Sequence, residues 1–138
     1  MTQTADEECV TACTKLCVDF ANGVDARLDQ KVASLFSPRG RFDHITGSFE
    51  GRDAILEMLR QRPQNMVTRH LCTNIDVTPQ GESQAHGRSY ITVFLVADSD
   101  GKLPLKPVLP LFVEYHDLYV KVDGRWAIQQ RRPIPVFV

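Results

Sequence analysis

The chain has 138 residues and a formal net charge of −1, with 43% hydrophobic and 24% charged residues. This length and composition are typical of one globular domain, and the scatter of lysines and arginines excludes the clustered basic surface of a nucleic-acid-binding protein. The acidic start, MTQTADEECV, lacks the apolar run of a signal peptide. No stretch reaches the roughly 20 apolar residues of a membrane span, so we expect a cytoplasmic protein without membrane contact.

Helices dominate the prediction for the N-terminal half. Their expected ranges are residues 6–24, 28–36 and about 53–61. The first carries apolar side chains at amphipathic spacing and three acidic residues in its first turn, where the helix dipole favours negative charge. Ser37-Pro38 ends the second helix. A short hairpin, with strands at 41–45 and 48–50, leads into the third.

The C-terminal half is predicted to be a meander of long antiparallel strands. They span residues 67–77, 85–97, 111–122 and 125–132. Asp123-Gly124, between the last two strands, is a strong hairpin signal. The tail 133–138, PIPVFV, is apolar, and its prolines exclude it from a central strand.

This order of elements indicates a single α+β domain over residues 1–138. Four long strands would expose an apolar face unless the N-terminal helices covered it. A curved antiparallel or mixed sheet wrapped around those helices forms a cone, and such a cone encloses an apolar pocket for a small hydrophobic molecule. The open outer face of the sheet and the apolar tail predict a homodimer or homotrimer.

Four cysteines raise the question of a disulfide or a metal site. Cys9, Cys13 and Cys17 form one stripe on the first helix, where neighbours four residues apart are poorly placed to bridge, and Cys72 lies on a strand. Without a CxxC pair or a matching histidine, small buried hydrophobic side chains are the better interpretation. Neither the histidines nor the glycines show the spacing of a metal site or a phosphate loop, so we expect no metal and no cofactor.

Four segments carry a resemblance to a known family: GVDARLDQKVASLFSPRGRFDH, GSFEGRDAILEML, VTRHLCTNIDV and VKVDGRWAIQQR. In this order they resemble a SnoaL-like domain of the nuclear-transport-factor-2-like (cystatin-like) superfamily, over about residues 8–132. The superfamily holds scytalone dehydratase, hexachlorocyclohexane dehydrochlorinase, ketosteroid isomerase, polyketide cyclases and pure binding proteins, so the fold does not determine the chemistry. The resemblance is to the dehydratase and dehydrochlorinase branch, whose Asp–His dyad matches Asp25 and His70.

The resemblance implies that Asp25 and His70 meet in the pocket as catalytic residues. A neutral imidazole is a suitable base near pH 7, and a carboxylate on one ring nitrogen sets its tautomer and stabilises the imidazolium. We hypothesise that His70 removes a proton beside a leaving group or carbonyl while Asp25 orients it. The outcome would be elimination of water or halide, or isomerisation, without a cofactor. From the residues alone, a helix N-cap at Asp25 and a core histidine at His70 are the simpler interpretations.

Further residues are expected to bind the substrate. They are Phe20, Val24, Thr68, Cys72, Val93, Tyr115 and Arg131. Alternation along a strand puts Thr68 and Cys72 on the face of His70. By resemblance, Tyr115 and Arg131 match pocket residues of the dehydrochlorinase. Arg131 is a candidate to steady a developing anion, or else a solvated residue at a strand end.

The sequence departs from the named enzymes at three of these positions. Phe20 stands where the dehydrochlorinase has a lysine, and Val24 and Val93 stand where scytalone dehydratase has a tyrosine and a second histidine. These replacements indicate a more apolar pocket and a cyclic, hydrophobic substrate. The adjacent Asp43 and His44 point to opposite faces of a strand, so one of them is expected to face the pocket.

Two other functions stay open at this stage. The domain could bind a small molecule without turning it over. It could also be an assembly module, such as the small subunit of a ring-hydroxylating oxygenase. Both belong to the same fold.

Overall fold

The first helix, α1, spans Ala5–Asp25 in the computed structural model, which describes residues 3–138. It begins at a capping box, in which Thr4 Oγ1 accepts from the Glu7 N–H and the Glu7 carboxylate accepts from the Thr4 N–H. The helix is one residue longer at each end than predicted. Its three cysteines are buried free thiols, which agrees with their interpretation as small hydrophobic side chains for Cys9 and Cys13. Cys17 differs, because its sulfur lies 3.1 Å from the Tyr119 hydroxyl and accepts from Arg131 Nη2 at 3.4 Å.

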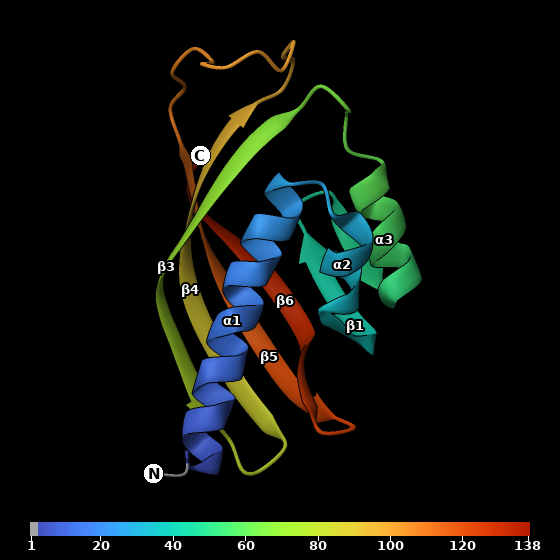
Figure 1. The fold of residues 1–138 in the computed structure, drawn as a ribbon, viewed down its shortest axis with the longest axis vertical. Coiled ribbons are helices and arrows are strands. Elements are labelled where there is room, and N and C mark those ends of the chain that lie inside the picture. Colours follow the sequence, from blue (N-terminus) through green and yellow to red (C-terminus); the bar gives the residue numbers. More distant parts are fainter. Residues whose placement is uncertain (1–2) are drawn as a thin grey trace.

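Two shorter helices, α2 (Asp29–Ser34) and α3 (Arg52–Arg60), pack together beside the C-terminal end of α1 (Figure 1). They bury Val32, Ile55 and Leu59. The prediction of 28–36 for the second helix was too long. Phe36 begins a strand instead, and its fully buried ring packs edge-on against Phe20 of α1.

Six strands form one mixed sheet in the order β2-β1-β6-β5-β4-β3. Their bounds are β1 Phe36–His44, β2 Gly47–Glu50, β3 Val67–Pro79, β4 Gln84–Val96, β5 Leu111–Val122 and β6 Arg125–Phe137. Neighbouring strands are antiparallel except β1 and β6, which run parallel. The mixed sheet curved over N-terminal helices confirms the predicted α+β class.

The last strand corrects the predicted C-terminus. Residues 133–137 do not form a separate tail but continue β6, where Pro133 and Pro135 pair with Tyr115 and Val113 of β5. The pairing of β1 with β6 ends at Arg131. Beyond that residue β6 has a neighbour on one side only, so the missing proline N–H groups leave no ladder position unfilled.

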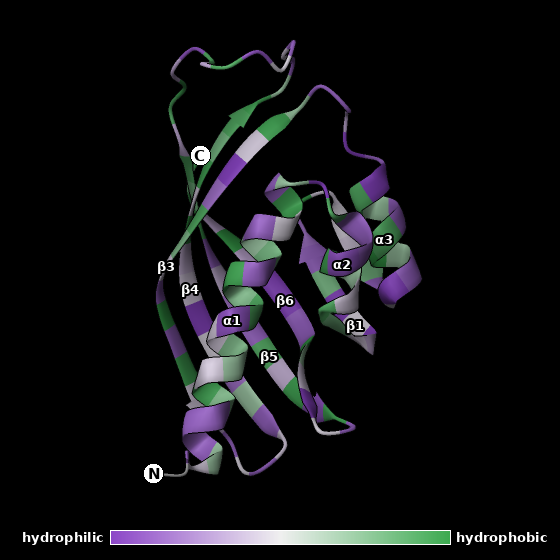
Figure 2. Cartoon of the chain, viewed as in Figure 1, coloured by the Kyte–Doolittle hydropathy of each residue, from purple (hydrophilic) through white to green (hydrophobic). Residues whose placement is uncertain are grey.

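The helices cover one face of the sheet. α1 packs against β3 and β6, and its buried stripe joins side chains from all the long strands in one hydrophobic core. Figure 2 shows hydrophobic and hydrophilic residues alternating along β3 and β5, as expected of strands with one face against helices and the other free. No helix within residues 3–138 has both the length and the apolar character needed to cross a membrane.

Candidate functional site

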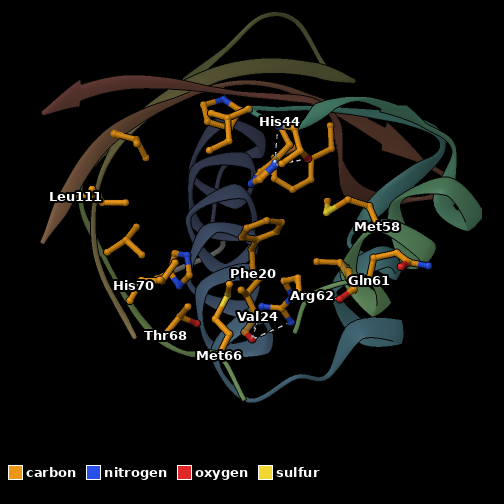
Figure 3. A pocket seen from close by; sticks show the side chains of 18 of the residues that line it. Phe20, Val24, His44, Met58, Gln61, Arg62, Met66, Thr68, His70 and Leu111 are labelled. Atoms are coloured by element: carbon orange, nitrogen blue, oxygen red, sulfur yellow. Dashed lines mark hydrogen bonds between the residues drawn. The ribbon is translucent and has the colours of Figure 1, made fainter. Parts of the chain in front are cut away.

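A cavity of about 590 Å³ lies between the end of α1, α3 and the inner face of the sheet (Figure 3). Side chains from α1, α3 and all six strands line it, and most of them are aliphatic or aromatic. Phe20 of α1 and Val93 of β4 are two examples. An apolar enclosure of this size accommodates a small organic molecule.

Asp25 and His70 meet at the wall of this cavity. Asp25 is the last residue of α1, and His70 lies on β3 with its ring directed into the cavity (Figure 3). Asp25 Oδ1 lies 2.6 Å from His70 Nδ1, and Asp25 Oδ2 accepts from the His70 backbone N–H at 2.8 Å. The Thr68 hydroxyl donates to Asp25 Oδ1 at 2.9 Å. Asp25 is the last residue of α1, so its interpretation as the N-cap of a helix was wrong.

These contacts favour the ionised form of Asp25 and set the tautomer of a neutral His70. Burial alone would raise the pKa of the Asp25 carboxyl, but the hydrogen bonds from His70 and Thr68 outweigh it and hold that pKa below its usual value. A carboxylate only accepts hydrogen bonds, so a neutral His70 carries its proton on Nδ1. Its Nε2 then has a free lone pair, which is the arrangement of a general base.

Five of the seven expected substrate-binding residues line the cavity. They are Phe20, Val24, Thr68, Val93 and Tyr115. Cys72 does not line it: this half-buried side chain packs against the hydrophobic core beyond the cavity. Alternation along β3 placed it on the correct face, but the cavity extends only as far as His70.

Arg131 is also outside the cavity, and it is not solvated. It is fully buried, and its Nε and Nη2 donate to the two carboxylate oxygens of Asp117 at 2.9 and 2.8 Å. Its guanidinium lies 4.5 Å from the centre of the Phe20 ring and 4.3 Å from that of Tyr115. Arg131 thus supports two cavity-lining rings from behind, and both sequence-based interpretations of it were wrong.

Of the adjacent pair on β1, His44 lines the cavity and Asp43 faces away from it. Asp43 accepts from Arg41, Ser48 and Gln130 on the other side of the strand. The expectation that one of the two faces the pocket is therefore met by the histidine.

The sequence did not single out several other lining residues. Those outside the predicted set include Phe42, Phe49, Met58, Gln61, Arg62 and Leu95. The apolar stripe of the third helix was a signal for Met58, but a stripe shows which face points inward and not whether it meets packed side chains or a cavity. Arg62 pairs with Asp29 at 3.0 Å and donates to the carbonyl of Val24, which joins α3 to the end of α1.

The site holds no evident metal centre. Within residues 3–138, no group of three or more histidine, cysteine, aspartate or glutamate side chains is placed to bind a metal ion.

Comparisons with known proteins agree on the fold. A sequence profile of the SnoaL-like domain matches residues 6–132. No curated protein matches the chain. A protein of unknown function with a cystatin-like fold from Nostoc punctiforme is 16% identical, with a TM-score of 0.77 over 99% of this chain and 96% of that one.

Two further solved structures carry enzyme names. A candidate scytalone dehydratase from Novosphingobium aromaticivorans is 23% identical, with a TM-score of 0.76 over 92% of this chain and 83% of that one. A hexachlorocyclohexane dehydrochlorinase is 19% identical, with a TM-score of 0.74 over 92% of this chain and 84% of that one. At these identities the likeness establishes the cystatin-like fold alone.

Proposed function

The chain belongs to the SnoaL-like domain family, and we propose that it is a cofactor-free lyase or isomerase acting on a small, hydrophobic, cyclic molecule. The observation that carries the proposal is the hydrogen bond between Asp25 Oδ1 and His70 Nδ1 at the wall of an apolar cavity. The names of two structural neighbours, a dehydratase and a dehydrochlorinase, support this class of reaction.

The proposed reaction begins with removal of a proton from carbon. His70 Nε2 takes the proton, and the electron pair of the C–H bond forms a carbon–carbon double bond or an enolate. Asp25 stabilises the resulting imidazolium, and its attraction is stronger beside an apolar cavity than in water.

The next step distinguishes the possible outcomes. In a dehydration, the departing hydroxide takes the electron pair of the C–O bond and the proton from His70, and leaves as water. In a dehydrohalogenation, the halide leaves with its electron pair and His70 returns the proton to solvent. In an isomerisation, His70 returns the proton to a different carbon.

The rest of the lining favours apolar substrates. Phe20, Val24 and Val93 all face the cavity, at positions where the two resembled enzymes carry polar catalytic groups. Binding would therefore depend on shape and apolar contact, with few polar groups setting the orientation.

The test compares the wild type with His70→Ala on a panel of cyclic alcohols, halides and enones, with products separated and identified by mass spectrometry. Loss of a general base lowers kcat by about 100-fold to 10,000-fold, so His70→Ala should lose nearly all turnover. His86→Ala is the matched control, because His86 lies on β4 outside the cavity and should leave turnover unchanged.

Equal rates for the wild type and His70→Ala, including no turnover by either, would refute the proposal. Calorimetric binding of panel members by both proteins would then favour a ligand-binding domain. Co-purification with a larger iron–sulfur protein would favour an assembly module.

A further inference from the structure

A second imidazole faces the same cavity. His44, the last residue of β1, lines the cavity and packs edge-on against Phe42, with ring centres 5.4 Å apart. Figure 3 shows the rings of His44 and His70 projecting into the cavity from different walls. A ligand in this cavity therefore has an imidazole on two of its walls.

The hydrogen bonds of His44 determine where its proton lies. The backbone N–H of Thr46 donates to His44 Nδ1 at 3.3 Å, and the Thr46 hydroxyl lies 2.9 Å from the same nitrogen. A backbone N–H can only donate, so Nδ1 is an acceptor and the neutral ring carries its proton on Nε2. Burial, with a contribution from the charge of Arg62, lowers the pKa of His44 and favours this neutral form.

The Nε2–H group of His44 is free to bind a ligand. It forms no hydrogen bond with any residue in the described part of the chain. In Figure 3 it is the ring nitrogen without a dashed line, and it points into the cavity. His44 is only partly buried, and a ligand oxygen in this apolar cavity would replace whatever contact this donor makes with water.

The two histidines are therefore held in opposite tautomers. Asp25 holds the proton of His70 on Nδ1, which leaves Nε2 as an acceptor. Thr46 holds the proton of His44 on Nε2, which makes that nitrogen a donor. Two other polar groups of the lining already have acceptors: Thr68 donates to Asp25, and the Arg62 guanidinium donates to Asp29 and Val24.

We propose that His44 Nε2–H donates a hydrogen bond to a carbonyl oxygen of the substrate while His70 Nε2 removes a proton from the adjacent carbon. The inference rests on the proposed function and narrows its substrates to apolar cyclic ketones and enones, rather than halides that lack oxygen. As the proton moves to His70, the C–H electron pair spreads onto the carbonyl oxygen. The hydrogen bond from His44 then strengthens, since it faces growing negative charge.

Tyr115 is the rival donor to be separated from His44. Its hydroxyl has no hydrogen-bond partner among residues 3–138, and Tyr115 lines the same cavity. The tests below therefore use His44→Phe, which keeps an aromatic ring against Phe42, beside Tyr115→Phe, which removes only the hydroxyl.

The first test measures the tautomers by NMR, through long-range correlations between ring protons and isotopically labelled ring nitrogens near neutral pH. His44→Phe assigns the His44 signals by their loss. We expect the proton of His44 on Nε2. A proton on Nδ1, or on both nitrogens, would overturn the inference.

The second test uses β-tetralone, an apolar bicyclic ketone with acidic C–H bonds next to its carbonyl, labelled with a heavy carbon isotope at that carbonyl. Its C=O infrared stretch should move to lower frequency in the wild-type complex. In His44→Phe the shift should vanish and binding should weaken about three- to tenfold, the value of one hydrogen bond. Tyr115→Phe should keep the shift. Loss of the shift in Tyr115→Phe, with His44→Phe unchanged, would overturn the inference.

The infrared measurement needs no turnover, so the two proposals can fail separately. A shift that depends on His44, with equal turnover by wild type and His70→Ala, would refute only the proposed reaction. Turnover that depends on His70, with an unchanged shift in His44→Phe, would refute only the role of His44.

Discussion

Asp25 illustrates how hydrogen bonds set the ionisation of a single residue at this site. Its side chain is 14% exposed, yet two groups of His70 and the Thr68 hydroxyl bind its carboxylate. Burial favours the protonated acid and the hydrogen bonds favour the anion, and the hydrogen bonds prevail. The folded protein therefore holds Asp25 ionised more strongly than the unfolded chain does.

This difference predicts how stability depends on pH. Since the pKa of Asp25 is lower in the folded state, the unfolded state binds more protons as the pH falls. The stabilisation is present above the unfolded pKa, about 3.9, and is lost as the pH falls through the lower folded value. Asp25→Asn should make the free energy of urea unfolding fall less between about pH 6 and about pH 3. A pH dependence as steep as that of the wild type would contradict this assignment.

Arg131 is a second residue whose ionisation is set by its partners, and it is fully buried. Its guanidinium is paired with both oxygens of Asp117, and the Tyr119 hydroxyl also donates to that carboxylate. Burial alone would lower the pKa of Arg131, but the Coulombic attraction to Asp117 and the hydrogen bonds with it, together with smaller contributions, outweigh burial and hold that pKa above its usual value. The positive charge of Arg131 is thus paired with Asp117, on the side of Phe20 and Tyr115 away from the cavity. It does not face a ligand in the cavity.

Among the elements, β1 contains a glycine at a close approach to its neighbours. The register between β1 and β6 shifts between Phe36 and Arg41, and Gly40 lies in this irregular stretch. A Cβ at Gly40 would lie 2.8 Å from Phe36 Cβ and 2.9 Å from the Ile128 carbonyl oxygen. The backbone cannot move away from this contact without disturbing the pairing that carries β1 to the cavity.

Gly40→Ala should therefore destabilise the fold. The added methyl group overpacks a closely paired strand, and we expect a loss of about 1–3 kcal/mol in the free energy of unfolding. Arg39→Ala is the matched control, because that neighbouring side chain is exposed and its removal should change stability by less than about 0.5 kcal/mol. Equal urea midpoints for the two variants would show that the strand can absorb the methyl group.

At the scale of the whole molecule, the outer face of the sheet carries exposed aromatic side chains. Tyr90, Phe112 and Phe137 form an outer aromatic cluster, with ring centres 5.3 Å apart for the first pair and 5.8 Å for the second. Tyr90 is 38% and Phe137 69% exposed. Contiguous apolar surface of this kind is typical of a protein interface.

We predict a homodimer or homotrimer that uses this outer aromatic cluster. Light scattering during size-exclusion chromatography should give two or three times the chain mass of 15.6 kDa. Phe137→Glu should shift the protein toward the monomer, because an interface core tolerates an unpaired charge poorly. Leu109→Glu, at a residue that is 92% exposed in the loop before β5, should keep the wild-type mass. A monomeric wild type would contradict the prediction.

Local patterns in the sequence were sufficient for α1, for most of the long strands and for the fold class, but not for the boundary between α2 and β1. The spacing of apolar residues in α1 and alternation along the long strands predicted these elements to within about two residues, except for the C-terminal extension of β6. The positions of Asp25 and His70 came from the family resemblance, since neither residue carries a local signal of catalysis.

Tertiary structure alone decided the rest, because those features depend on groups far apart in the chain. Pro133 and Pro135 are tolerated in β6 only because β1 pairs with β6 no further than Arg131. Beyond that residue, β5 is the only neighbouring strand of β6. Arg131 lies outside the cavity and pairs with the carboxylate of Asp117 on β5. No spacing in the sequence predicts that pairing. Asp25 and His70, 45 positions apart, share a hydrogen bond only because α1 ends against β3, and the cavity beside them is enclosed by side chains from α1, α3 and all six strands.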